Sequence, residues 1–241
     1  MAVKLDILVM AVHPDDAELG CSGTIAKHIS MGYKVGIVDF TRGELGTRGS
    51  AEIRDDEAAA SAKVMGLAAR KNLRFRDGFF KNDEEHQMKL MQVIRKYQPE
   101  IVLANGISDR HPDHGRSSAL AVDACFYAGL RMVPTYNEDG SAQKEWRPKH
   151  LYHYIQDRYI EPDFVIDITD FWDVKDKAIR AFGSQFYDPN SADPQSYISS
   201  PDFLDFVEAR SREMGHKIGV KYGEGFTSYQ TQGVSDLMKL S

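Results

Sequence analysis

The sequence predicts an α/β fold: a Rossmann-like, mostly parallel open sheet with helices on both faces. Short apolar runs that are typical of buried strands recur along the chain, and patterns typical of helices lie between them. Strands that alternate with helices in this way form parallel sheets. Histidine-containing polar clusters also follow two of the apolar runs, and open α/β sheets bind their ligands at the carboxyl ends of the strands.

The expected strands are mostly continuous apolar runs. The first has the sequence LDILVMAV and the second KVGIVDF, while the fourth follows the helix-breaking sequence Gln98-Pro99-Glu100. We expect strands at residues 5–12, 34–40, 72–75, 101–104, 150–156 and 164–168.

The expected helices have apolar residues at helical spacing, and some carry end signals. Gly32 stands where a helix C-terminus often has glycine, and Ser50 can cap the helix that follows it. The 241 residues, 42% of them hydrophobic, suffice for one core, so we expect a single domain spanning 1–241. We expect helices at residues 17–31, 50–67, 83–97, 117–130, 170–182 and 200–220.

The overall charge and the cysteine content exclude several classes of protein. The net charge is −6 and the pI about 5.8, which disfavours binding to nucleic acid and to anionic membranes. Cys21 and Cys125 are too few for a zinc ribbon or a disulfide framework, and we expect both to be small buried apolar residues. No run of 18 apolar residues occurs, so we expect a cytoplasmic protein without a nucleic-acid or membrane partner.

The first polar cluster is His13-Pro14-Asp15-Asp16, directly after the first expected strand. Imidazole and carboxylate groups suit zinc, which in catalytic sites takes three protein ligands and leaves a position for water. Adjacent residues of an extended segment point in opposite directions, so one carboxylate can bind metal while the other acts as a general base. The competing interpretation is that Asp15 and Asp16 only cap the following helix.

The second polar cluster is His111-Pro112-Asp113-His114, after the strand at 101–104. In an extended segment His111 and His114 would face different sides, so we expect them to have different roles. One can complete the metal shell. The other, oriented by a carboxylate such as Asp113, can stabilise an oxyanion and protonate a leaving amine. Alone this cluster could be a polar turn, but a parallel sheet brings both strand ends to one edge, and together the clusters predict a hydrolytic zinc site.

Some further residues have weaker signals. Asp109 is a candidate for positioning His114 or Arg110, with an ordinary loop residue as the alternative. We expect His150 and His153 to point to opposite faces of a strand, and so not to form a ligand pair. The glycine-rich loop at 41–49 lacks the spacing of nucleotide-binding motifs, so we expect it to line a substrate pocket.

Several arginines are expected on or near the same edge of the sheet. Guanidinium groups bind carboxylates in a bidentate way, so these arginines would suit a small anionic substrate. Two of them, Arg42 and Arg48, can equally be solvated surface residues. The set is Arg42, Arg48, Arg54 and Arg110.

These motifs resemble the LmbE-like, or PIG-L, family of zinc-dependent N-acetylglucosaminyl deacetylases. Two C-terminal segments are similar to one branch, the bacillithiol-biosynthesis deacetylases of the BshB type, which remove acetate from N-acetylglucosaminyl-malate. The chain departs from the family pattern at two positions. Val12 replaces the alanine that many relatives have before the first histidine, and Arg110 precedes HPDH where other relatives have different residues. The matching segments are AVHPDD at 11–16, TRGELGTRG at 41–49, Arg54, HPDH at 111–114, SQFY at 184–187 and GVKYGEGF at 219–226.

The resemblance implies a role for each candidate residue. The implied zinc ligands are His13, Asp16 and His114. Asp15 would be the general base, and His111 the oxyanion stabiliser and acid, with Asp113 as its orienting partner. The implied substrate contacts are Arg54, Arg110 and Tyr197.

The resemblance also implies a cofactor and partners. A site of two histidines and one aspartate accepts Fe²⁺, Co²⁺ or Mn²⁺ as well as Zn²⁺. The implied substrate is a small anionic amino sugar, and because relatives are often oligomeric, a homo-oligomer is implied too. N-acetylglucosamine, chitin-derived oligosaccharides and a thiol-conjugate amide are the alternative substrates. A non-catalytic metal- or sugar-binding protein is the alternative of another class, although a binder needs neither Asp15 nor His111.

Overall fold

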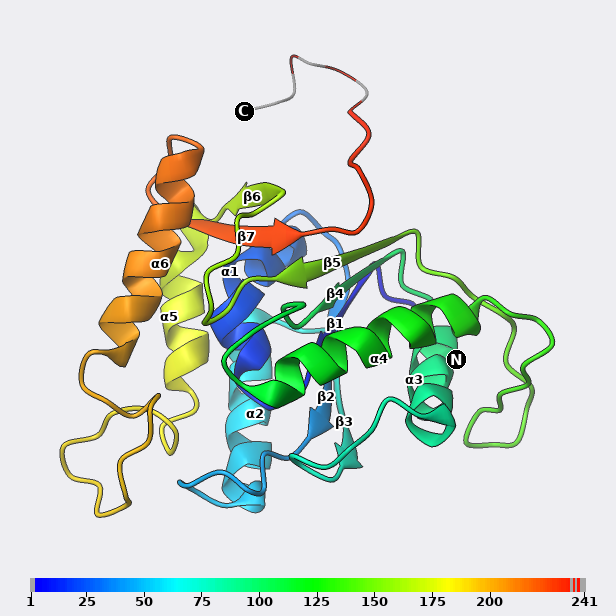
Figure 1. The fold of residues 1–241 in the computed structure, drawn as a ribbon, viewed down its shortest axis with the longest axis horizontal. Coiled ribbons are helices and arrows are strands. Elements are labelled where there is room, and N and C mark those ends of the chain that lie inside the picture. Colours follow the sequence, from blue (N-terminus) through cyan, green and yellow to red (C-terminus); the bar gives the residue numbers. More distant parts are fainter. Residues whose placement is uncertain (1–2, 235, 237, 239–241) are drawn as a thin grey trace.

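The computed structural model describes residues 3–234, 236 and 238, and its centre is a seven-stranded sheet with the order β3-β2-β1-β4-β5-β7-β6 (Figure 1). The strands are β1 (Ile7–Ala11), β2 (Val35–Thr41), β3 (Ala69–Phe75), β4 (Ile101–Ala104), β5 (His150–Tyr154), β6 (Phe164–Asp167) and β7 (Gly223–Thr227). The helices are α1 (Asp16–Ser30), α2 (Ala51–Met65), α3 (Glu84–Tyr97), α4 (Pro112–Ala128), α5 (Trp172–Arg180) and α6 (Phe203–Lys217), with a short 3₁₀ helix η1 (Thr169–Phe171).

The sheet is mostly parallel, as the sequence predicts. Strands β3, β2, β1, β4 and β5 pair in parallel, whereas β7 is antiparallel to both of its neighbours. Strand β1 lies between β2 and β4, so the chain first builds the sheet in one direction and then returns to the other side of β1. Ligands of open α/β sheets bind at such a topological switch point.

Helices cover both faces of the sheet. Helices α3 and α4 pack together on one face, and α1, α2 and α5 lie on the other, with α6 against β7 (Figure 1). Two large apolar clusters fill the spaces between the sheet and these layers, and a third lies among α1, α2, α5 and α6. Cys21 and Cys125 are buried in these clusters with free thiols, as predicted.

Three differences from the prediction have physical causes. Strand β3 begins at Ala69 rather than residue 72, because Arg70 and Lys71 interrupt its apolar pattern. Strand β7 was missed because glycine is depleted in strands, yet Gly223 and Gly225 stand where a side chain would collide with neighbouring atoms. Helix α4 begins at Pro112 rather than residue 117, since proline is favoured in the first helical position.

Among the described residues, no helix has both the length and the apolar character needed to cross a membrane.

A buried cluster of charges links α1, β2 and β3. The guanidinium of Arg70 binds both oxygens of Asp39, at 2.8 and 2.9 Å, and donates to Glu18 at 2.6 Å. These side chains are at most 9% exposed. Removing one cation from such a cluster leaves carboxylates buried without compensation.

We therefore expect Arg70→Met to lower the free energy of unfolding by about 3–5 kcal/mol, measured by urea denaturation at pH 7. Arg180→Met is the matched control, because Arg180 forms an exposed ion pair with Asp176. Its loss should cost at most about 1 kcal/mol. Equal effects of the two substitutions would contradict this account of the cluster.

Candidate metal centre

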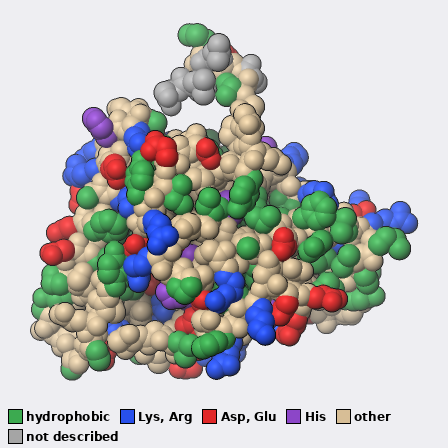
Figure 2. Space-filling model, viewed as in Figure 1, with side chains coloured by type: hydrophobic (Ala, Val, Ile, Leu, Met, Phe, Trp, Pro, Cys, Tyr) green, Lys and Arg blue, Asp and Glu red, His purple; other side chains and the backbone are tan. Residues whose placement is uncertain are grey.

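The two histidine clusters meet at the switch point of the sheet. His13 follows β1, His111 immediately precedes α4, and His114 lies in the first turn of α4. One ring nitrogen from each of these histidines lies within 4.8 Å of the others. Figure 2 shows histidine side chains in the lower half of the face in view, among acidic and basic groups.

Asp16 lies between His13 and His114. Its Oδ2 is 3.5 Å from His13 Nδ1, and its Oδ1 is 3.2 Å from His114 Nε2. The same carboxylate accepts hydrogen bonds from the backbone N–H of His13, from Asn105 and from Gln156. These contacts fix the orientation of Asp16 toward both imidazoles.

The second nitrogen of each imidazole has its own carboxylate partner. His13 Nε2 is 3.0 Å from Asp77 Oδ1, and His114 Nδ1 is 2.7 Å from Asp109 Oδ2. Metal-ligating histidines usually have such a partner on the nitrogen that faces away from the ion. Two imidazole nitrogens and one carboxylate are also a donor set for zinc and other first-row divalent ions. The residues around Asp16 therefore fit a divalent metal.

The carboxylates also change the proton affinity of the two histidines. Burial lowers the pKa of His13, but the nearby carboxylates of Asp113, Asp16 and Asp77 outweigh burial and raise this pKa well above its usual value. Burial likewise lowers the pKa of His114, whereas Asp16 and Asp109 raise it to about 9. A divalent cation would supply positive charge to the same carboxylates.

Asp15 has an unusual backbone conformation for a residue with a side chain. Its φ is 119°, and such strain in a non-glycine residue is found mainly at functional sites. Although Asp15 is the N-cap residue of α1, its side chain makes no capping hydrogen bond. It instead accepts a hydrogen bond from Arg54 Nη2 at 2.7 Å, so helix capping does not account for Asp15.

Arg54 is buried against Asp15 rather than open to solvent. Its guanidinium donates to the backbone oxygens of Pro14 and Gly43 as well as to Asp15. Burial raises the pKa of Asp15 to about 7, even though the positive charge of Arg54 lowers it. Gly43 has a φ of +64° and would place a Cβ 1.9 Å from Arg54, so this loop needs glycine there.

The first turn of α4 sets the positions of His111 and Asp113. His111 is the N-cap residue, and its Nδ1 accepts the backbone N–H of Asp113 at 3.2 Å. In the neutral imidazole Nε2 then carries the proton. Burial, together with the charges of His13 and His114, lowers the pKa of His111 and favours this neutral form.

Two expectations for this cluster are corrected. The segment is a helix start and not an extended stretch, so His111 and His114 lie on neighbouring positions of one turn. Within the described residues the carboxylate of Asp113 has no hydrogen bond to His111: it accepts from Gly78 and Arg116 and lies 3.7 Å from His13 Nε2. The contact of Asp113 with His111 comes from its backbone.

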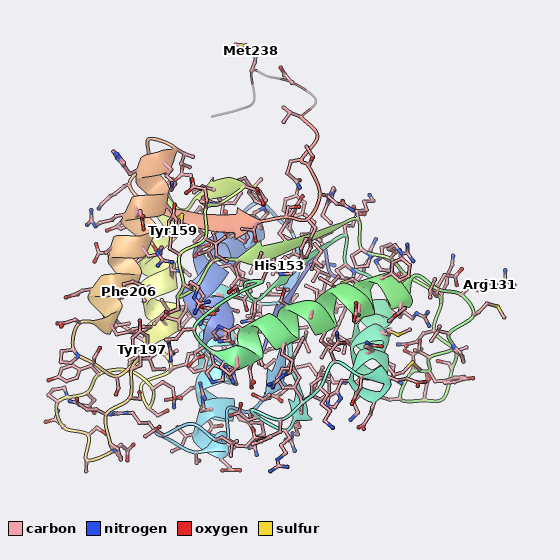
Figure 3. All side chains as sticks on the ribbon, viewed as in Figure 1. Arg131, His153, Tyr159, Tyr197, Phe206 and Met238 are labelled. Carbon is pink, nitrogen blue, oxygen red and sulfur yellow. The ribbon has the colours of Figure 1, made fainter. Side chains whose placement is uncertain are left out.

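The arginines at this edge differ in exposure. Arg42 pairs with Asp55 at 2.7 Å, and Arg48 is buried and donates to the carbonyl of Ser184. Arg110 remains exposed, with its guanidinium 4.1 Å above the ring of Tyr197 and its Nε 3.6 Å from Asp157. Figure 3 places Tyr197 near the N-terminal end of α6. Arg110 and His114 line one cavity, which places Arg110 beside one histidine of the cluster.

The sequence interpretation missed three residues that hold the site. They are Asp77, Asn105 and Gln156, and each follows the carboxyl end of a strand. Polar residues just after the carboxyl end of a parallel strand are candidates for a binding site, and this rule could have identified all three. The predicted contact of Asp109 with His114 is confirmed.

His150 and His153 do not belong to the site. His150 is exposed and His153 fully buried, as the predicted alternation requires. Nδ1 of His153 lies within hydrogen-bond distance of two oxygens, the carbonyl oxygen of Asn105 at 2.8 Å and Ser118 Oγ at 3.1 Å.

Asp109→Asn should weaken metal binding by about 10- to 100-fold, because His114 loses the carboxylate that orients it. Isothermal titration of the metal-free protein with Zn²⁺ measures this change. Asp83→Asn is the matched control, since Asp83 also binds a histidine, His86, but on α3 and away from the cluster. Equal zinc affinities of the two variants would show that Asp109 does not support a metal ligand.

Comparisons with known proteins agree with this geometry. The family model described as PIG-L, GlcNAc-PI de-N-acetylase, matches residues 8–125. A diacetylchitobiose deacetylase of Thermococcus kodakarensis is 31% identical over 191 residues, which cover 75% of this chain and 70% of that protein. The chain belongs to the PIG-L, or LmbE-like, family. The predicted resemblance is thereby confirmed, and the deacetylases of this metal-dependent family hydrolyse amides.

Other members of the PIG-L family differ in the reactions for which they are named. A probable N-acetyl-α-D-glucosaminyl L-malate deacetylase of Bacillus subtilis is 28% identical over 203 residues, covering 76% of this chain and 84% of that protein. A 4-oxalmesaconate hydratase of Pseudomonas putida is also 28% identical over 203 residues, covering 74% and 73%.

Solved structures of the family share the whole fold. A conserved protein of Thermus thermophilus is 37% identical and superposes with a TM-score of 0.85, covering 96% of this chain and 98% of that one.

Proposed function

We propose that this PIG-L family member is a zinc-dependent deacetylase of an N-acetylglucosamine conjugate, with N-acetyl-α-D-glucosaminyl L-malate as its substrate. The observation that carries the proposal is the placement of Asp16 between His13 and His114, each backed by a further carboxylate. In this assignment His13, Asp16 and His114 hold the metal. Zinc, when bound, supplies Lewis acidity to a water molecule and to the amide carbonyl.

The neighbouring side chains perform the proton transfers and hold the charge. Asp15 accepts the proton of the attacking water, and Arg54 keeps the carboxylate in place through one of its two oxygens. His111 has its Nδ1 occupied by the N–H of Asp113, so Nε2–H is available to the carbonyl oxygen as negative charge develops. The amine that leaves must also gain a proton, and Asp15 can deliver the one that it took from the water. His111 can be the donor only in its protonated form, in which Nδ1 carries a proton and no longer accepts the N–H of Asp113.

The malate group is supported by two observations. Arg110 is an exposed arginine on the wall of the cavity that contains His114, and it can bind a carboxylate in a bidentate way. The Bacillus subtilis relative named for this substrate matches most of the chain. In this proposal the substrate is a small anionic amino sugar, and the enzyme acts in the cytoplasm.

Acetate release from three substrates tests this choice. The zinc-loaded protein should hydrolyse N-acetylglucosaminyl-malate faster than N-acetylglucosamine or diacetylchitobiose. Arg110→Gln should raise KM for the malate conjugate by about 10- to 150-fold, because a charged hydrogen bond contributes roughly 1.5–3 kcal/mol, and leave KM for diacetylchitobiose unchanged. Arg131→Gln is the control, since Arg131 lies at the opposite end of the molecule from Tyr197, the residue over which Arg110 stacks (Figure 3).

The other outcomes separate the alternatives. Equal rates on all three substrates would argue against a dedicated malate pocket and for an enzyme of free or chitin-derived amino sugars. Hydrolysis of a thiol-conjugate amide alone would make the protein an amidase. Zinc binding without hydrolysis of any amide would indicate a binding protein, and hydration of a carbon–carbon double bond would indicate a hydratase.

A further inference from the structure

Helix α1, which begins with Asp16, is interrupted one turn after its start. Cys21 has φ −150° and ψ 19°, which are not helical values, although helix continues on both sides of it. An interruption of this kind leaves carbonyls of the first segment and N–H groups of the second without their helical partners. In a continuous helix the N–H of Gly23 would pair with the carbonyl of Leu19.

A buried ion pair from two distant segments lies at this interruption. Lys175 of α5 donates to the carbonyls of Leu19 at 2.8 Å and of Glu18 at 3.3 Å. Glu224 of β7 accepts the N–H groups of Gly23 at 3.0 Å and of Thr24 at 2.7 Å. Lys175 and Glu224 contact each other at 2.7 Å, and Figure 1 shows α5 and β7 beside α1.

The packing around the interruption leaves little freedom. A Cβ on Gly20 would lie 2.2 Å from the ring of Tyr154, and one on Gly23 would lie 2.7 Å from Ile168. The side chains of Lys175 and Glu224 are 1% and 2% exposed. Because desolvation offsets much of the attraction within a buried ion pair, stability alone does not explain why these two charges are here. A continuous helix would need neither of them.

We propose that Lys175 and Glu224 are positioning residues for the metal centre. They hold α1 in its interrupted form, and so orient the segment Asp16–Gly20 relative to His13 and His114. This gives a role to the C-terminal sequence GVKYGEGF, in which Glu224 reaches α1 while the two flanking glycines let α6 pack closely against β7 at Met214. The inference rests on the proposed function, because it takes Asp16 to be a metal ligand.

Cobalt binding tests this inference without relying on turnover. Lys175→Met and Glu224→Gln are to be titrated with Co²⁺, recording both the dissociation constant and the visible absorption bands that report ligand geometry. We expect each substitution to weaken Co²⁺ binding about tenfold or more and to change the bands. The double variant should be no worse than Lys175→Met, since the two residues act together.

Arg95→Met is the matched control. Arg95 is likewise a buried cation that donates to backbone carbonyls at a helix end, those of Ala128, the last residue of α4, and of Leu130, but it lies away from the histidines. This variant should lose stability and keep the native Co²⁺ affinity and spectrum.

Native affinity and spectrum in the Lys175 and Glu224 variants would overturn the inference, whatever their thermal stability. If Lys175→Met does not fold, the nearly isosteric Glu224→Gln decides. A native protein that fails to bind Co²⁺ would overturn the proposed metal centre itself, and this inference with it. If only the inference is wrong, the native protein binds Co²⁺ and the variants bind it equally well. This outcome differs from failure of the metal centre, in which the native protein does not bind Co²⁺.

Discussion

Replacing Asp15 by asparagine should lower kcat for deacetylation by about 10²- to 10⁴-fold while the metal stays bound. The expected loss is large because Asp15 is the proposed acceptor of the water proton, and asparagine cannot take it. Asparagine is the suitable replacement, since it tolerates a positive φ better than most residues and can still accept a hydrogen bond from Arg54. Steady-state kinetics of acetate release, with zinc content measured on the same sample, gives the result.

The chain contains a matched control for this experiment. Asp55 also pairs with an arginine, Arg42, close to the glycine-rich loop, but it does not lie at the histidine cluster. Asp55→Asn should keep kcat near the native value. An Asp15→Asn variant as active as Asp55→Asn would show that the proton acceptor is another group.

Removing the metal should abolish hydrolysis and lower the melting temperature. His13 lies just after β1, Asp16 begins α1 and His114 lies in the first turn of α4, so a bound ion ties these elements together. Any ligand that binds only the folded state stabilises it, by about 2.7 kcal/mol when present at 100 times its dissociation constant. Dialysis against a chelator, followed by calorimetry and acetate release, measures both effects.

Restoring the metal provides the control for chelation. Zn²⁺ or Co²⁺ should return both the activity and the melting temperature of the native protein, but neither property of a His114→Ala variant. Full activity in a protein shown to be free of metal would refute the proposed role of the cluster.

The fold was predictable because it depends on patterns along the chain. The apolar runs that form β1, β2 and β4 can be recognised from the sequence alone, and their parallel pairing follows from the helices between them. Strand β7 could not be predicted, because glycine and glutamate have low strand propensity. Glu224 and its flanking glycines fit this position through their tertiary contacts.

The site was predictable in its residue types but less so in its contacts. The two clusters, at 13–16 and 111–114, were expected at one edge of the sheet because parallel strands end together, and the family resemblance pointed to His13, Asp16 and His114 within them. The pairing of Arg54 with Asp15 joins positions 39 residues apart, and periodicity carries no information about such a contact. The helical start at Pro112 also changed the geometry of His111, since a short polar motif does not by itself distinguish a turn from a helix cap.

The position of the metal is the central claim, and a crystal structure of the zinc-loaded protein with anomalous diffraction measures it most directly. We predict a single peak about 2.0–2.2 Å from His13 Nδ1, an oxygen of Asp16 and His114 Nε2. A second set of potential ligands, Asp77 and Asp113 with His13, lies on the other side of the same imidazole. A peak there, or no peak at saturating zinc, would contradict the account.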